Sequence, residues 1–221
     1  MEVNERWYAR HTQIFPAPYR DRVIVIGAGA IGSHLVAALV KLGCLNITVF
    51  DPDVVEAHNL GNQIYGPAHV GMTKIAALAN YFTLLGYLSP PFSGHAETIT
   101  PSSLVNFDKA HVFLAVDSMA ARREILEAHC AKAWWVYDTR IGVDHSTMIS
   151  FDPGKHIPEY LNTWAPDSEI PADSPCGTRI TVGSTVHITV GFIVKEFMER
   201  VVGRGKAWAF AHYAHPNLTT L

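Results

Sequence analysis

Three glycines that follow an apolar run constrain the fold of this chain more than any other feature. After the run at residues 23–26, Gly27, Gly29 and Gly32 follow the spacing GxGxxG at the start of a helical pattern over residues 30–42. The first glycine of this motif permits a tight turn, the second lets a phosphate approach the backbone, and the third lets the helix pack close to the sheet. Because backbone N–H groups at a helix N-terminus favour an anion, the segment predicts a nucleotide-binding turn rather than one that only packs a helix.

An acidic residue at the end of the next apolar run supports this interpretation. Asp51 follows the run at residues 47–50 and comes 19 positions after Gly32. A carboxylate there can accept hydrogen bonds from the hydroxyl groups of a ribose. The motif and this acid together indicate a bound nucleotide, but they do not distinguish ATP from NAD(P).

Strand-like and helical patterns alternate along the rest of the chain. This alternation predicts an α/β fold with a Rossmann-like, doubly wound and mostly parallel sheet that has an antiparallel extension. The expected strands lie at residues 23–26, 47–50, 96–99, 111–116, 134–137 and 143–151, with a closing strand within 206–221. The expected helices lie at residues 30–42, 73–85, 120–131 and 177–202.

The chain is expected to form one domain, residues 1–221, because this length fits a single domain of ordinary size. The polar and aromatic residues 1–20 predict an N-terminal arm. Residues 153–175 contain five prolines and several acids. A segment of this kind predicts a long, mobile crossover loop.

Composition excludes several classes of function. The net charge is −3 and no Lys/Arg cluster is present, which argues against a nucleic-acid partner. No segment is long and apolar enough for a membrane span, and the polar N-terminus is unlike a signal peptide. Three cysteines without a CxxC pair fit a reducing compartment. We therefore expect a cytoplasmic protein with neither a nucleic-acid nor a membrane partner.

Polar side chains after the second apolar run indicate more than dinucleotide binding. Asp53, Asn59, Gln63 and Lys74 follow one another closely in this part of the chain. Lys74 begins a predicted helix just beyond a polar loop, where an ammonium group is well placed to hold a polyphosphate. A dehydrogenase would need hydride-transfer geometry and a proton relay, and no later motif indicates them.

A further acid lies at the carboxyl end of another predicted strand. Asp117 follows the run at residues 111–116, and Arg122 lies in the helix that comes next. Ligands of open α/β sheets bind along this edge, and Mg²⁺ prefers one or two carboxylates together with phosphate oxygens. Asp117 is therefore a candidate ligand for Mg²⁺ that accompanies a nucleotide.

Four segments together resemble the ThiF/MoeB/HesA family, prokaryotic relatives of the ubiquitin-activating enzymes. They read GAGAIGSH, DPDVVEAHNLGNQ, VGMTK and AVDSMAAR, and the resemblance extends over roughly residues 7–202. It implies a Rossmann-like mixed sheet, a homodimer, and ATP-dependent adenylation of a carboxylate with release of pyrophosphate. The implied substrate is the C-terminal glycine of a small ubiquitin-like or sulfur-carrier protein.

The resemblance also implies roles for individual positions. It implies that Asp51 binds ribose, that Lys74 neutralises phosphate charge, and that Asp117 binds Mg²⁺. The catalytic residues that follow from it are Asp117, Lys74, Arg122 and Cys176. The expected nucleotide-binding residues are Gly27, Gly29, Ala30, Ile31, Gly32, Asp51, Asp53, Asn59, Asn62, Gln63 and Lys74.

Two positions depart from the family pattern. Asn62 stands where the family usually has an arginine that holds terminal phosphates. Thr12 stands where it has an arginine that often reaches the site of the neighbouring subunit. Two alternatives therefore accompany the adenylyltransferase: a catalytically weakened nucleotide-binding partner protein, and an NAD(P)-binding oxidoreductase.

Cys176 lies between a proline-rich stretch and a predicted helix, in the sequence DSPCGTRI. Several family members place a cysteine near this point that forms a thioester or persulfide link. A helix N-terminus favours the thiolate form of such a residue. The alternative is a small loop residue without a chemical role.

Overall fold

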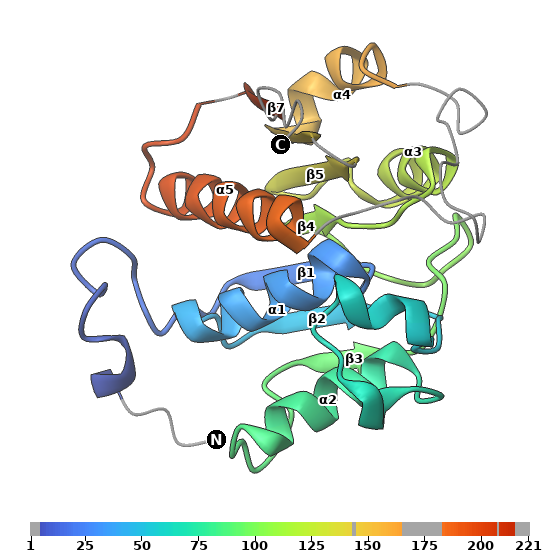
Figure 1. The fold of residues 1–221 in the computed structure, drawn as a ribbon. Helices are drawn as coiled ribbons and strands as arrows, with labels where there is room; N and C mark the ends of the chain where they lie inside the picture. The colour runs from blue at the N-terminus through green and yellow to red at the C-terminus, as the bar shows by residue number, and fades with distance from the viewer. Residues whose placement is uncertain (1–4, 143–144, 165–182, 207, 215–221) are drawn as a thin grey trace, which may run out of the picture.

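A seven-stranded sheet runs through the described part of the chain, residues 5–142, 145–164, 183–206 and 208–214 of a computed structural model (Figure 1). The strands are β1 (Arg22–Ile26), β2 (Ile47–Phe50), β3 (Ser93–His95), β4 (Ala110–Leu114), β5 (Trp135–Ile141), β6 (His145–Phe151) and β7 (Trp208–Ala214). Their order is β3-β2-β1-β4-β5-β6-β7. Strands β1 to β5 pair in parallel, whereas β6 and β7 are antiparallel to their neighbours. The predicted mostly parallel sheet with an antiparallel extension is confirmed.

Helices cover both faces of the sheet, because successive residues of each central strand point to opposite sides. Val23 and Val25 of β1 pack in one apolar cluster with residues of α1, α2 and α5, whereas Ile24 and Ile26 pack in a second cluster with residues of α3 and α4. The helices are α1 (Ala30–Leu42), α2 (Lys74–Leu84), α3 (Met119–His129), α4 (Pro153–Leu161) and α5 (Gly183–Val201). The sheet is therefore doubly wound, as the sequence predicts.

Helix caps fix the positions of two expected site residues. The Thr73 hydroxyl accepts a hydrogen bond from the Ala76 N–H, so α2 begins at Lys74. The Ser118 hydroxyl caps α3 in the same way, through the N–H of Ala121. A side-chain cap satisfies an N–H group that the helix leaves without a partner, so both helices have defined starts. Lys74 and Asp117 consequently lie at helix N-termini.

Two segments differ from the sequence-based expectation. Residues 153–175 were expected to form a loop, but α4 occupies the first part, with Asp152 accepting a hydrogen bond from the Gly154 N–H. Pro153 suits this helix because its missing N–H would be unpaired at the first position in any case. Residues 165–175 lie outside the described part. The third strand is β3, which comes earlier than the expected residues 96–99 and is exposed throughout.

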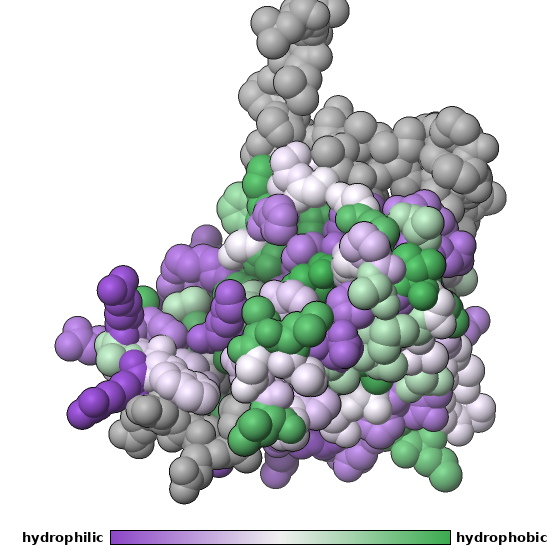
Figure 2. All heavy atoms as spheres, turned by 60° about the horizontal axis from the view of Figure 1, so that its bottom comes forward, coloured by the Kyte–Doolittle hydropathy of each residue, from purple (hydrophilic) through white to green (hydrophobic). Residues whose placement is uncertain are grey.

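No helix in the described ranges is both long enough and apolar enough to cross a membrane. Figure 2 views the end of the molecule that carries α2 and β3, and it shows apolar side chains in separate patches between polar ones. Leu84, Leu85 and Leu88 are the exposed leucines where α2 ends.

A buried histidine joins two tyrosines at the centre of the α1 and α5 face. The Nε2 and Nδ1 atoms of His111 each lie 3.0 Å from a tyrosine hydroxyl, of Tyr19 and Tyr137 respectively. Phe197 of α5 packs edge-on against the His111 ring. Burial lowers the pKa of His111 to about 4; Asp21 opposes this effect and Arg200 adds to it. The imidazole is therefore neutral in the folded protein near pH 7.

This histidine predicts a loss of stability in mild acid. Between pH 6.5 and about 4 the unfolded chain binds a proton at His111 that the folded protein does not, so the free energy of unfolding falls as the pH is lowered. The full effect is about 3 kcal/mol. Urea unfolding at several pH values would measure it. The His111→Gln variant should show a flatter pH dependence than the wild type, and the exposed-site control His58→Gln should not. An unchanged slope in His111→Gln would contradict the assignment.

Candidate nucleotide-binding site

The glycine turn lies at the switch point of the sheet, between β1 and β4, where the order of the strands along the sheet reverses. Gly27 adopts φ +98°, and a Cβ atom there would stand 2.6 Å from the carbonyl oxygen of Ala115. A Cβ atom on Gly32 would stand 1.8 Å from the carbonyl oxygen of Gly27. A Cβ atom on Gly29 would meet no atom within 4 Å. Packing therefore requires a glycine at positions 27 and 32. Gly29 instead faces an open space at the switch point, where ligands of such sheets bind.

Asp51 ties the glycine turn to the next strand. Its carboxylate accepts a 2.6 Å hydrogen bond from the N–H of Ala28 and a 2.9 Å hydrogen bond from the N–H of Asp53. Burial raises the pKa of Asp51, and Lys74 together with these two N–H groups partly offsets that rise. The structure thus adds a role in shaping the turn to the ribose contact that the family resemblance implies.

Tyr65 is a residue of this site that sequence reasoning missed. It is buried, and its hydroxyl donates a 2.7 Å hydrogen bond to the carbonyl oxygen of Ala28. The neighbouring Ile64 N–H donates to the hydroxyl oxygen of Ser33 on α1. These two contacts hold the polar loop across the first turn of α1. No sequence signal distinguishes a loop tyrosine that returns to the turn from one that lies in solvent.

Lys74 is buried between two carboxylates. Its ammonium nitrogen lies 2.7 Å from an oxygen of Asp53 and 3.8 Å from an oxygen of Asp51. The Lys74 N–H also donates to the carbonyl oxygen of Asp53. The Asp53 side chain is 61% exposed, so a ligand can reach this ion pair from solvent. The structure brings the expected lysine and both expected acids together.

The amides of the polar loop have different surroundings. The side-chain oxygen of Asn59 accepts a hydrogen bond from the Glu56 N–H, which stabilises the short helix at Ala57–Gly61. The side-chain oxygen of Gln63 is buried and has no hydrogen-bond partner among the residues that the structure describes. A buried polar atom without a partner is costly, so the Gln63 amide is suited to contact a ligand.

Asp117 is exposed on the connection between β4 and α3. The glycine turn touches this connection, since a Cβ atom on Gly27 would lie 3.0 Å from the Val116 N–H nitrogen. Asp117 therefore directly follows the segment that the glycine turn touches, at the carboxyl end of the sheet. A single carboxylate in this position suits Mg²⁺ that is held mainly by phosphate oxygens. Across the described ranges, no group of three or more His, Cys, Asp or Glu side chains is arranged to hold a metal ion.

Arg122 has a different environment from the one expected of a catalytic residue. It is 4% exposed, and its guanidinium forms an ion pair with Asp138 and donates to the carbonyl oxygens of Leu114 and Val116. Asp138 is fully buried and also pairs with Arg140. The Arg122 side chain thus stabilises the end of β4 and the residues that follow it. These contacts suit a residue that supports the segment before Asp117, and the catalytic role that the sequence suggests for Arg122 stays a prediction.

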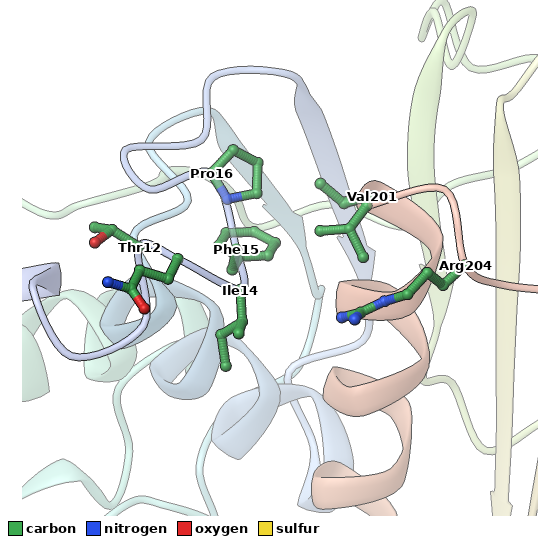
Figure 3. A pocket seen from close by; sticks show the side chains of 8 residues that line it. Thr12, Ile14, Phe15, Pro16, Val201 and Arg204 are labelled. Carbon is green, nitrogen blue, oxygen red and sulfur yellow. The ribbon is translucent and has the colours of Figure 1, made fainter.

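Two further expected positions lie away from this arrangement. Cys176 falls outside the described residues. Thr12 lines a hollow of about 470 Å³ between the N-terminal arm and the end of α5, where Figure 3 shows arm residues on one side and Val201 with Arg204 on the other. Because α5 has 19 residues, this hollow is roughly 28 Å from the helix end that meets the polar loop. It is separate from the nucleotide site.

An open glycine turn at the switch point of a doubly wound sheet, with acids and a lysine along the same edge, defines a Rossmann-like nucleotide-binding protein. The chain belongs to the ThiF family, whose sequence model matches residues 19–220. The family match agrees with the fold and the candidate site, because it spans the glycine turn, the polar loop and Asp117.

Curated relatives resemble only part of the chain. Ubiquitin-like modifier-activating enzyme 5 of Drosophila simulans is 28% identical over 91 residues, which is 41% of this chain and 22% of that protein. Adenylyltransferase and sulfurtransferase MOCS3 of Anopheles gambiae is 29% identical over 109 residues, 49% of this chain and 25% of that protein. The chain spans about a quarter of the length of these relatives.

Solved structures resemble nearly the whole chain in fold. PaaA matches with a TM-score of 0.66 and 16% identity, over 96% of this chain and 64% of that one. The tRNA N6-threonylcarbamoyladenosine dehydratase TcdA of E. coli matches with a TM-score of 0.63 and 18% identity, over 92% and 97%. MccB of E. coli, solved with ATP, matches with a TM-score of 0.61 and 15% identity, over 85% and 58%.

Proposed function

We propose that this chain is an ATP-dependent adenylyltransferase that activates the C-terminal carboxylate of a small ubiquitin-like or sulfur-carrier protein. The observation that carries the proposal is the open space at Gly29, on a sheet edge that also holds Lys74 with its two acids and the exposed Asp117. Family membership and the names of the relatives agree with this activity.

The residues present fit a bound nucleotide. The backbone N–H groups at the start of α1 point at the space beside Gly29 and favour phosphate oxygens. Lys74 and Gln63 lie on the loop side, and Asp117 lies on the β4 side, where it would hold Mg²⁺ together with phosphate oxygens. Bound Mg²⁺ would neutralise charge on the phosphates.

In the reaction, an oxygen of the substrate carboxylate forms a bond to the α-phosphorus of ATP. The bond from that phosphorus to the bridging oxygen breaks, and pyrophosphate leaves with the electron pair. The chain supplies positioning and charge stabilisation rather than a covalent group for this step. We further propose that the Cys176 thiolate can attack the carbonyl carbon of the acyl-adenylate, which forms a thioester and releases AMP, and that the active form is a cytoplasmic homodimer.

Mass spectrometry of candidate carrier proteins tests the proposal. Carriers that end in glycine should gain one AMP group when they are incubated with the chain, ATP and Mg²⁺. The same carriers with an amidated C-terminus should not change, since they lack the attacking carboxylate. An adduct on the enzyme that dithiothreitol removes, and that Cys176→Ser lacks, would show transfer to the cysteine. Absence of adenylate from every carrier would contradict the enzyme.

One observation favours the weakened-site alternative. Lys74 is already paired with Asp53 and Asp51, and Asn62 supplies no charge where the family usually has an arginine. A protein of this kind would bind ATP without forming adenylate. Tight binding of NAD⁺ with none of ATP would instead indicate an oxidoreductase.

A matched pair of glycine variants separates the nucleotide role from the structural role. Gly29→Ala should change the free energy of unfolding by less than about 1 kcal/mol, because no protein atom is near the new methyl group. Its affinity for ATP should fall at least about tenfold, since the methyl group takes space that a phosphate needs. Gly32→Ala should lose about 1–3 kcal/mol of stability, because its methyl group meets the Gly27 carbonyl. Urea unfolding and ATP titration measure both, and wild-type ATP affinity in Gly29→Ala would contradict the placement.

A further inference from the structure

A pair of histidines joins α1 and α5, which lie side by side beside the glycine turn (Figure 1). The rings of His34 on α1 and His187 on α5 have centroids 4.8 Å apart and meet edge to face at 72°. His34 is half-buried and His187 is exposed. The nucleotide site as described above makes no use of either residue.

The direction of the helix places this pair at the phosphate end of the site. Side chains on a helix point back toward its N-terminus. His34 is on the same face of α1 as Ala30, and Ala30 lies one turn closer to the glycines. The backbone of Asn62 forms a hydrogen bond with His34. The start of α5 also meets this loop, because a Cβ atom on Gly183 would lie 3.7 Å from the Gly61 carbonyl oxygen. The histidines, the loop and the start of α1 therefore share one corner.

The side chains along this edge leave a polyphosphate short of cationic groups of the protein itself, beside the Mg²⁺ proposed at Asp117. Asp51, Asp53 and Asp117 contribute three carboxylates along the edge, and Lys74 is engaged by two of them. The triphosphate of ATP brings several more negative charges. A proton taken up by a histidine supplies positive charge where a fixed cation is lacking.

The elements that pack around His34 contribute few other titratable groups. The other titratable side chain of α1 is Lys41, about two turns further along the helix. The first three turns of α5 carry one titratable side chain, that of His187. The loop contributes His58, which pairs with Glu56. Burial, and to a lesser extent His187, lowers the pKa of His34, whereas the Asn62 backbone opposes this effect. The free protein therefore holds His34 mainly neutral, ready to accept a proton.

We propose that His34 and His187 form a proton-linked subsite for the terminal phosphates of ATP, in which one imidazole takes up a proton as the nucleotide binds. This inference rests on the proposed function, because it assigns a role toward the same nucleotide. It makes ATP affinity depend on pH through the protein, whereas the affinity for AMP, which lacks the terminal phosphates, does not share this dependence.

Calorimetry of ATP binding with Mg²⁺, in two buffers of different ionisation enthalpy, counts the protons taken up. Wild type should take up protons with ATP but not with AMP, and its ATP dissociation constant should rise about tenfold between pH 6 and pH 8, the factor of one pKa unit. His34→Gln and His187→Gln should each reduce this uptake, and Lys41→Gln should behave as wild type. Because His187 is exposed, its variant keeps the test free of folding effects.

The possible failures are distinguishable. ATP binding that takes up no proton, or equal uptake in wild type and both histidine variants, overturns the subsite and leaves the adenylyltransferase standing. Absence of ATP binding at both pH values overturns the proposed function, and the subsite with it.

Discussion

Replacing Arg122 with leucine should lower the free energy of unfolding by about 3–5 kcal/mol. The substitution removes one of two arginines that pair with the fully buried Asp138, and it removes the guanidinium hydrogen bonds to the carbonyl oxygens of Leu114 and Val116. A buried charge or carbonyl that loses its partner costs more than the contact itself contributes. Urea unfolding of wild type and variant measures the difference.

The neighbouring Arg123 provides the matched control. It lies on the same helix, is exposed, and pairs with Glu127 one turn away. Arg123→Leu should change the free energy of unfolding by less than about 1 kcal/mol. If both variants lose the same stability, Arg122 does not hold the end of β4 in the way described.

Asp117→Asn should reduce the adenylation rate by about 100-fold or more, the loss typical of removing a group that stabilises charge in the transition state. The variant should keep the stability of the wild type, because Asp117 is exposed and the cap of α3 belongs to Ser118. Exchange of labelled pyrophosphate into ATP measures the rate, and urea unfolding measures the stability.

Glu124→Gln is the control for this substitution, since it removes an exposed carboxylate from α3 away from the glycine turn. Its exchange rate should equal that of the wild type. A wild-type rate in Asp117→Asn would remove Asp117 from the site. Equal losses in both variants would indicate a general effect of charge rather than a bound metal.

The sequence was sufficient to predict the fold and the proximity of several expected site residues, because both depend on local patterns. The spacing of Gly27 and Gly32 predicts the turn, and the structure shows that a side chain at either position would collide with the backbone. Apolar runs fully buried on both faces predicted β1 and β4. Lys74 and Asp51 were expected in the same site, and they lie within 3.8 Å of each other.

What the sequence did not reveal depends on contacts between distant segments. Arg122 looked available for catalysis, because its partner Asp138 lies on the next strand and 16 positions away. Tyr65 reaches back across 37 positions to the glycine turn. The prolines of α4 suggested a loop. A helix forms nevertheless, because the packing of Tyr160 in the core favours it more than the prolines disfavour it.

Exchange of labelled pyrophosphate into ATP, catalysed by the wild type with a carrier protein that ends in glycine, tests the central claim most directly. The account predicts exchange that requires Mg²⁺ and the free carboxylate of the carrier, and that falls at least about 100-fold in Asp117→Asn. No exchange with any such carrier, together with binding of NAD⁺ in preference to ATP, would contradict it.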